Sequence, residues 1–335
     1  LELPGGANLS GAGLLYNTGT MLATNNPTLN VMIENAGTWN VGSFRVGTQI
    51  IANTGRINLK GNNLKIGRSG TNPGPLINDD GGTIRVDNGA LTYTIEAPFE
   101  QLDEGLTEVV SGTLRFQGLD SIRLGGRFTA DADGEYQLYS PLSQTGGGEI
   151  LFDGDGTAIV GAVPWLSTLV INSGDSLRAK MGDFRQESAN IILRSGTRIR
   201  NERKYSWKGG KIYSTENANA NRAFENVSKL VIEQGGTKQL GVKLRNIGDS
   251  ANVEQYNTIT LLDGGTTNGT GQIINGSQAH WRIRSIANIQ GRMQTNPSPS
   301  EVSFLNEGRF FHEHPGASSI YVDFLNNDLV WVPQG

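Results

Sequence analysis

Two short acidic phrases carry the strongest chemical signal in this chain. Residues 131–134 and 153–156 both spell Asp-x-Asp-Gly, and they begin 22 positions apart. Carboxylate oxygens are ligands that Ca²⁺ prefers. If the phrases stack in neighbouring turns of a repeating fold, the carboxylates that would converge on one calcium ion are Asp131, Asp133, Asp153 and Asp155. The alternative is a pair of solvated turns, because Asp and Gly are also common turn residues.

A second segment concentrates positive charge beside aromatic rings. Arginine binds carboxylates through a planar fork, and an indole ring offers a face for a sugar or a cation. We therefore expect this cluster to bind a surface glycan or an acidic patch of a neighbouring copy. The residues in question are Arg198, Arg200, Arg203, Lys204 and Trp207. The alternative is a solvated strand face followed by a loop.

Residues suited to catalysis are scarce. His312 and His314 flank Glu313, and on a strand both imidazoles would share one face, as a metal pair requires. No third ligand stands at an obvious spacing, so the alternative is an exposed segment before Pro315. The chain has three histidines and no cysteine, and it lacks a Gly-x-Ser-x-Gly nucleophile elbow. We expect no catalysis and no cofactor apart from the possible calcium ion.

The overall composition excludes several classes of protein. The chain has 335 residues, 18% of them charged, and a net charge of -4, which argues against a nucleic-acid groove. No window approaches the roughly 18 apolar residues of a membrane span. The chain begins at Leu1 without a methionine, which is typical of a mature or excised segment. Abundant Gly, Asn, Thr and Ser favour an extracellular location.

An internal repeat must position these residues. The phrase Asn-x-Gly followed by Thr or Arg begins at Asn17, Asn35 and Asn53, at intervals of 18 residues. Apolar residues two apart follow, for example Trp39 and Val41, as a half-buried strand requires. Further along, turn glycines precede short strands at Gly112, Gly134, Gly154, Gly174 and Gly196. A period of about 18 to 23 residues suits one coil of a β-solenoid.

This period predicts an all-β β-solenoid in which glycine supplies the positive φ of each corner. The alternative fold is a β-sandwich or jelly roll, whose strands also recur regularly. The cadence weakens after residue 245, where segments 264–271 and 296–300 have the composition of loops. We therefore predict a solenoid repeat region over residues 1–245 and an irregular β-rich cap or assembly region over residues 246–335.

Apolar segments lie near both ends of the chain. They are Leu14-Leu15 and the run Leu329, Val330, Trp331 and Val332. The end of a solenoid exposes unpaired strand edges, which must be covered or joined to another strand. We expect these segments to mediate assembly between copies of the chain.

The phrases in residues 78–86, 97–99 and 110–116 resemble the degenerate repeats of large bacterial surface proteins. Those proteins are the β-solenoid passengers of adhesins, autotransporter-like proteins and filamentous-haemagglutinin-like proteins. The resemblance covers roughly residues 17–200 and implies an extracellular, self-assembling structural or adhesive protein of a surface filament, sheath or stalk. The alternative is a carbohydrate-binding or carbohydrate-active β-helix, such as a polysaccharide lyase or a phage tailspike-like protein. Such an enzyme could place Asp153, Asp155 and Arg178 on one sheet face.

Overall fold

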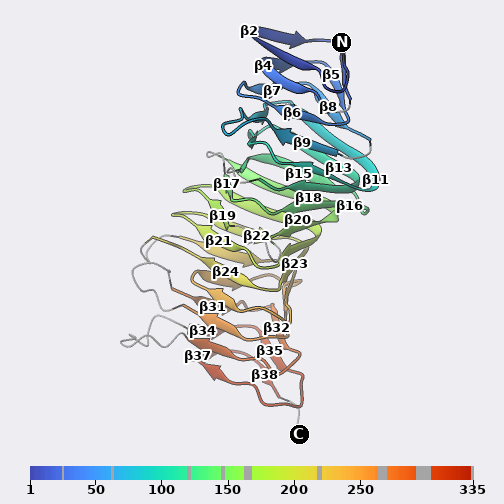
Figure 1. The fold of residues 1–335 in the computed structure, drawn as a ribbon. Helices are drawn as coiled ribbons and strands as arrows, with labels where there is room; N and C mark the ends of the chain where they lie inside the picture. The colour runs from blue at the N-terminus through green and yellow to red at the C-terminus, as the bar shows by residue number, and fades with distance from the viewer. Residues whose placement is uncertain are drawn as a thin grey trace. The chain divides into compact units, whose positions relative to one another are not determined.

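A computed structural model describes residues 1–335 except positions 25, 62–63, 119–121, 145–147, 162–167, 217–220, 263–269, 292–302 and 333–335. The chain divides into two compact units, Leu1–Gly161 and Ala162–Gly335. Both units are built from β-strands, and no helix occurs in the described residues (Figure 1). The all-β class predicted from the repeat is therefore confirmed, and the described part of the chain offers no helix that could cross a membrane.

The strands of the first unit are β1 (Glu2–Leu3), β2 (Asn8–Asn17), β3 (Thr20–Ala23), β4 (Thr28–Asn35), β5 (Thr38–Val41), β6 (Phe44–Val46), β7 (Ile51–Asn53), β8 (Arg56–Leu59), β9 (Leu64–Arg68), β10 (Leu76–Asn78), β11 (Thr83–Ile95), β12 (Phe99–Gln101), β13 (Leu106–Phe116), β14 (Ile122–Leu124), β15 (Gly126–Ala130), β16 (Gly134–Leu138), β17 (Leu142–Gln144) and β18 (Glu149–Val160).

The strands of the second unit are β19 (Thr168–Ile171), β20 (Ser176–Gln186), β21 (Asn190–Leu193), β22 (Arg198–Asn201), β23 (Lys204–Trp207), β24 (Gly210–Tyr213), β25 (Ala223–Asn226), β26 (Lys229–Ile232), β27 (Lys238–Leu240), β28 (Lys243–Asn246), β29 (Asn252–Gln255), β30 (Ile259–Leu261), β31 (Gln272–Asn275), β32 (His280–Ile283), β33 (Ile289–Gly291), β34 (Ser303–Asn306), β35 (Arg309–His312), β36 (Ile320–Tyr321), β37 (Asp323–Asn326) and β38 (Val330–Trp331).

Strand pairing in the first unit joins each strand to one that follows two or three strands later. β3 lies between β1 and β5, and β5 pairs with β8. A long strand such as β11 passes through two stacks, since residues Thr83–Val86 pair with β8 and Tyr93–Ile95 pair with β9. These pairings are parallel, as in a chain that coils upon itself. The described residues of this unit contain no antiparallel pair of the kind that a sandwich or jelly roll requires.

The second unit repeats this winding more regularly, in three parallel stacks of strands. The first stack is β22, β25, β28, β31, β34 and β37. The second stack is β23, β26, β29, β32, β35 and β38. The third stack is β21, β24, β27, β30, β33 and β36. The chain visits the first, second and third stacks in turn, so each circuit forms one coil.

The predicted division near residue 245 differs from the structure. The boundary between the compact units lies at Gly161 and Ala162, and all three stacks continue beyond Asn246 to the C-terminal strands. The repeat is harder to see in the sequence beyond residue 245 because more residues separate the asparagines that bond to each other. The separation is 29 residues from Asn246 to Asn275 and 31 from Asn275 to Asn306. Most of the predicted loops, residues 264–271 and 296–300, lie outside the described residues.

The core consists of alternate side chains that point into each coil. Trp39 and Val41 of β5 are buried while Thr38 and Asn40 between them are partly exposed, as the period of two requires. Aromatic rings stack from coil to coil, with Phe128 and Phe152 centred 5.0 Å apart. Each buried large apolar side chain contributes roughly 1.5–3 kcal/mol. One buried face per strand is therefore enough to hold neighbouring coils together.

Glycine performs two different tasks at the corners. Gly112 has a φ of 85°, a conformation that strongly favours glycine. Gly37 and Gly55 lack positive φ, so the predicted reason for glycine is wrong at these positions. They are required by close packing, because a Cβ on Gly37 would lie 2.2 Å from the backbone oxygen of Gly19, and one on Gly55 would lie 2.3 Å from that of Gly37.

An inward-facing amide ladder joins the corners of successive coils. In the first unit, Asn17 donates from Nδ2 to Oδ1 of Asn35 at 2.6 Å, and Asn35 donates to Asn53 at 2.7 Å. The ladder continues to Asn78 and then Gln101. A second ladder in the second unit runs through Asn201, Asn226, Asn246, Asn275, Asn306 and Asn326. Except at the exposed Asn326, the side chains of this second ladder are buried. The repeated asparagine thus bonds coil to coil, a role that its turn propensity did not suggest.

Candidate functional site

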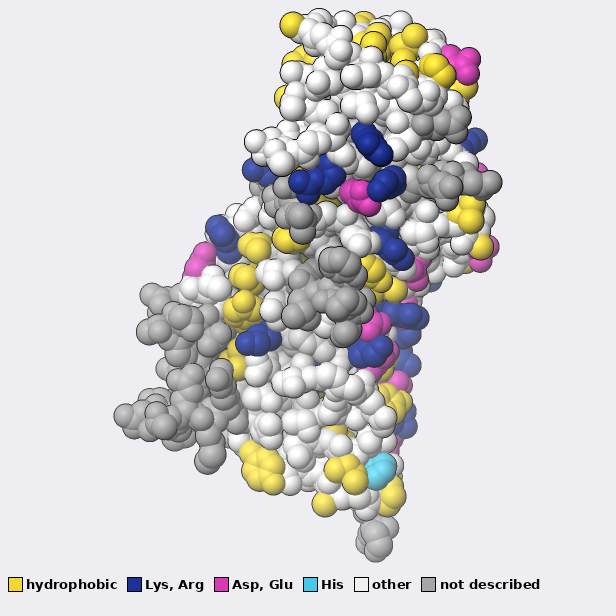
Figure 2. Space-filling model, viewed as in Figure 1, with side chains coloured by type: hydrophobic (Ala, Val, Ile, Leu, Met, Phe, Trp, Pro, Cys, Tyr) yellow, Lys and Arg dark blue, Asp and Glu magenta, His cyan; other side chains and the backbone are white. Residues whose placement is uncertain are grey.

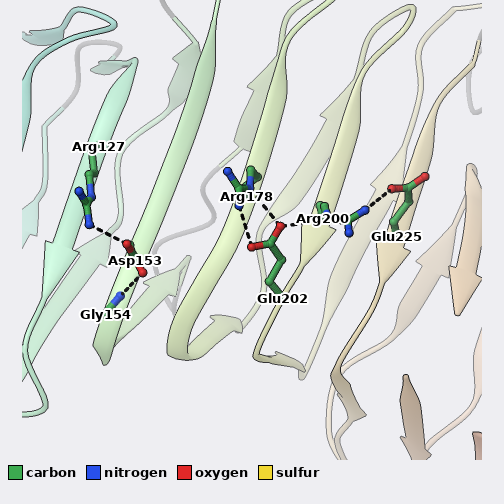
Figure 3. A network of polar contacts seen from close by, with 7 residues as sticks. All are labelled: Arg127, Asp153, Gly154, Arg178, Arg200, Glu202 and Glu225. Atoms are coloured by element: carbon green, nitrogen blue, oxygen red, sulfur yellow. Dashed lines mark hydrogen bonds and ion pairs between the residues drawn. The ribbon is translucent and has the colours of Figure 1, made fainter. Parts of the chain in front are cut away.

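The outer face of the second unit carries a network of alternating charges (Figure 3). Arg178 of β20 donates two hydrogen bonds to the carboxylate of Glu202, from Nε to Oε1 at 3.1 Å and from Nη2 to Oε2 at 2.9 Å. Arg200 of β22 bonds to Glu202 at 3.0 Å and reaches Glu225 of β25 at 3.3 Å. Arg245 of β28 binds the other oxygen of Glu225 at 3.2 Å. The register places Arg178, Arg200, Glu225 and Arg245 opposite one another in successive strands, so the network follows the stack.

The arginines of the network lower the pKa of Glu202. Hydrogen bonds from Arg178, and further ones from Arg200, lower the pKa of Glu202 below its ordinary value against the opposing effect of burial. Glu225 is only 5% exposed and lies between two arginines. Charge-assisted pairs in a network stabilise more than an isolated surface pair, which contributes roughly 0.2–1 kcal/mol. The physical effect of the network is to fasten neighbouring coils together.

A second cluster surrounds Asp183 on the neighbouring part of β20. Arg185 and Lys204 contact its carboxylate at 2.7 and 2.9 Å, and the Ser206 hydroxyl donates to it at 2.8 Å. Burial works to raise the pKa of Asp183, but these hydrogen bonds outweigh it and hold the pKa below its usual range. The cations of this cluster are therefore already engaged by an internal acid.

The predicted partner-binding or glycan-binding residues do not form one open surface. Trp207 is 1% exposed, so the prediction that its ring offers a stacking face is wrong. Tyr205 and Trp207 both point into the coil, whereas Arg200 and Lys204 pair with acidic neighbours. Arg198 and Arg203 are exposed on the surface. In Figure 2 basic and acidic side chains alternate over these strands, with no purely basic patch on the face shown.

The four aspartates predicted as calcium ligands are divided between a turn, which holds Asp131 and Asp133, and strand β18, which holds Asp153 and Asp155. The register sets Thr129 opposite Asp153, so Asp153 is not stacked on Asp131 as predicted. Asp153 instead accepts from Arg127 at 2.7 Å and from its neighbour's amide, Gly154 N, at 2.9 Å (Figure 3). Asp131 and Asp133 occupy the turn between β15 and β16. Within the described residues, no three acidic or histidine side chains gather as a metal site would need.

The segment His312-Glu313-His314 is engaged in local contacts. Glu313 pairs with both Arg282 and Arg284. Nδ1 of His314 accepts from the amide of Gly316 at 2.8 Å. The segment borders the C-terminal end of the second unit, where a different kind of site is found.

The C-terminal coil leaves its interior uncovered. Among the described residues, β36, β37 and β38 each pair with a strand on one side only. Ile320, Phe324 and Val330 stand opposite the buried core residues Ile289, Phe304 and Phe310, and therefore occupy core positions. Yet Phe324 is 37% exposed and Val330 is 39% exposed. A cavity of about 620 Å³ opens here, lined in part by these three core-position residues.

The predicted assembly residues belong to this open end. Leu329, Val330, Trp331 and Val332 are all exposed. Trp331 faces outward beside Phe311, with ring centres 6.4 Å apart, and Arg282 lies 4.6 Å from the centre of the Phe311 ring. Figure 2 shows hydrophobic side chains on the surface at the C-terminal strands, and further ones at the N-terminal strands.

The N-terminal coil is open in the same manner. Among the described residues, β1 pairs only with β3, and β2 pairs only with β4. Leu3, Leu9 and Leu15 occupy its core positions. They lie opposite Ala23, Leu29 and Ile33, which are completely buried. Leu14 and Tyr16 face outward and are more than half exposed.

Comparisons of this chain with protein-family models, with curated proteins and with solved structures found no match.

Proposed function

We propose that the chain is a structural subunit, without catalytic activity, that assembles with copies of itself through its open ends. The observation that carries this proposal is the uncovered interior of the C-terminal coil. Three core-position side chains, Ile320, Phe324 and Val330, line one opening. Complete burial of such a side chain contributes roughly 1.5–3 kcal/mol. Covering the parts that are still exposed, 37% of Phe324 and 39% of Val330, recovers a fraction of this energy and favours association with a surface that covers them.

Unpaired strand edges support the same function. A strand with open N–H and C=O groups pairs readily with a strand of another chain. At each end of the chain, every face of the coil presents such an edge among the described residues. Proteins that avoid association protect their edges with charges or a cap, whereas β38 ends in exposed apolar residues.

The proposed location is the cell surface or the extracellular space, as part of a filament, sheath or adhesive stalk. It is supported by the composition, which is rich in Gly, Asn, Ser and Thr and free of cysteine, and by the resemblance of the repeats to bacterial surface proteins. The internal pairing of the basic residues gives less support to the glycan-binding alternative, because Arg200, Lys204 and Trp207 serve the coil itself.

Sedimentation velocity over a range of chain concentrations tests the proposal. The wild-type chain should shift from monomer to larger species as concentration rises. Phe324→Glu should move this shift to at least about tenfold higher concentration, because a carboxylate in the opening is costly to bury without a partner. Leu91→Glu is the matched control, since Leu91 is 45% exposed and lies in β11, a strand paired on both sides and distant in sequence from both ends of the chain. A wild-type chain that stays monomeric at the highest soluble concentration would contradict the proposed function.

A further inference from the structure

Building on the proposed function, we infer that the interface is polar and directional: the C-terminal coil of one copy binds the N-terminal coil of a second copy. β36 pairs with β1 of the second copy, β37 with the first part of its β2, and β38 with the second part of its β2. This inference names the partner surface and its register, which self-assembly alone leaves open.

The N-terminal coil presents three edges in a fixed order. β1 lies on the edge of β3, since Leu1 O accepts from Leu22 N at 2.8 Å and Leu3 O accepts from Thr24 N at 3.1 Å. The first part of β2, Asn8–Ser10, pairs with Thr28–Asn30, and the second part begins after a register shift at Leu14. The chain then returns to the stack of β1 with β3.

The C-terminal coil presents three edges that follow the same winding. The chain runs through β36, β37 and β38, and a strand that continued this path would lie next on β36, because every third strand of this unit is paired. If β1 of a second copy takes that place, the two parts of its β2 fall on β37 and β38. If β1 lay on β37 instead, the edge of β36 would stay uncovered, and if β1 lay on β38, the edges of both β36 and β37 would stay uncovered. Only this arrangement continues the coil without a step.

The apolar residues of the two ends match face by face. Each face of the C-terminal coil has one core-position side chain, namely Ile320, Phe324 or Val330. Each face of the N-terminal coil also has one, namely Leu3, Leu9 or Leu15. Side chains alternate between the faces of a strand, so matching Phe324 to Leu9 sets both inward. The same register brings the outward Leu325 beside the outward Ser10 of the second copy.

The contact is heterologous, because two different surfaces of the chain meet. Such an interface can recur from copy to copy without limit, or close into a ring, whereas an isologous contact stops at a dimer. The inference therefore predicts which cross-links form between copies and which do not.

Cysteine cross-linking tests this directly, since the chain contains no cysteine. Neighbouring strands lie about 4.8 Å apart, within the Cα separation of roughly 4.4–6.8 Å that a disulfide spans. The double variant Leu325→Cys with Ser10→Cys should give a ladder of covalent multimers upon oxidation at concentrations where the wild-type chain associates. Neither single variant should cross-link, because each lacks the partner thiol. Circular dichroism and melting temperature establish that each variant is folded.

The single variants separate the competing geometries. A covalent dimer from Leu325→Cys alone would indicate that two C-terminal ends meet, and one from Ser10→Cys alone would indicate that two N-terminal ends meet. Either result would overturn the inference, as would a folded, associating double variant that gives no ladder. These results leave the proposed function standing, whereas that function fails if the wild-type chain never associates.

Mixing two blocked chains supplies a second test. Phe324→Glu blocks the C-terminal opening and Leu9→Glu blocks the N-terminal one, so each alone should associate at least about tenfold more weakly, a difference near 1.4 kcal/mol. Their equimolar mixture should recover heterodimers through the two intact ends, but no larger species. Wild-type-like association by Leu9→Glu alone would refute the role of the N-terminal coil.

Discussion

The amide ladder of the second unit gives the sharpest test of how the coils are held together. Asn226 is completely buried and accepts from Nδ2 of Asn201 at 2.6 Å. It donates to Oδ1 of Asn246 at 2.7 Å and to the carbonyl of Ser228 at 3.0 Å. Asn226→Ala removes these three hydrogen bonds at once, together with a longer one of 3.4 Å from Nδ2 of Asn226 to the carbonyl of Asn252. It leaves one N–H of Asn201 and the Oδ1 of Asn246 without their ladder partners at fully buried positions.

The cost follows from these two stranded groups. A buried donor or acceptor that loses its partner costs roughly 1–3 kcal/mol, so Asn226→Ala should destabilise the second unit by about 2–6 kcal/mol. Asn326→Ala is the matched control at the exposed end of the same ladder. It also removes a bond from Asn306, at 2.6 Å, but water can replace the lost partner there. Its cost should be about 1 kcal/mol or less.

Denaturant unfolding and native-state hydrogen exchange measure the two effects. Stacked repeats can open locally, so exchange of the amides in β22, β25 and β28 locates the loss of stability as well as its size. We expect Asn226→Ala to accelerate exchange in these three strands and Asn326→Ala to spare them. Equal, small effects of both substitutions would refute the reasoning, since they would show that buried ladder bonds are no stronger than exposed ones.

Three further predictions concern single side chains. Gly37→Ala should destabilise the first unit by more than about 1 kcal/mol in thermal unfolding, because its Cβ would clash with the carbonyl oxygen of Gly19, whereas Gly19→Ala, which has open space, should be nearly neutral. Burial lowers the pKa of Lys238 from 10.5 to about 8. Between these two pH values the unfolded chain binds more protons than the folded chain, so the free energy of unfolding rises with pH, by about 3 kcal/mol in total. Urea unfolding of the wild type and of Lys238→Met at pH 7 and pH 10 measures this rise, and we expect the variant to lack it. A rise of the same size in the variant would exclude Lys238 as its source. The bonds that Arg178 makes to Glu202 lower the pKa of the acid, so their stabilisation is present above the ordinary value of 4.5 and is lost as pH falls through the lowered pKa. Glu202→Gln should therefore lower the melting temperature at pH 7 but reduce the loss of stability on acidification, and a variant as acid-sensitive as the wild type would contradict this.

The fold class was accessible from the sequence because strand alternation and corner spacing are local properties. Trp39 and Val41 stand two apart after a repeated phrase, and both lie in the core as this pattern predicts. The predicted boundary at residue 245 was wrong because the spacing of the repeat in the sequence reflects the number of residues between strands. Strand pairing depends instead on which strands lie side by side. Asn246 and Asn275 bond to each other across 29 residues as well as Asn226 and Asn246 do across 20.

The side-chain sites were harder to predict because they depend on register and on which face points inward. Tyr205 and Trp207 share a face of β23, and that face is the core, but charge around them suggested an open surface. The prediction that Asp131 stacks on Asp153 was wrong because the number of residues in the corner sets the register, which places Thr129 opposite Asp153. The asparagine ladder left a visible signal in the repeated Asn-x-Gly phrase, yet only the structure distinguishes an inward amide from a turn-forming one.

The geometry of the amide ladder does not depend on the number of residues in a coil. Consecutive asparagines of the two ladders stand 18, 20, 25, 29 or 31 positions apart, while the bond between them stays at 2.6–2.8 Å. Residues added between strands thus need not disturb the strands above and below. Such a scaffold can accept foreign peptides in the intervals between its strands while each coil keeps its neighbours, which makes those intervals places where new sequence can arise, or be grafted, at little cost to folding.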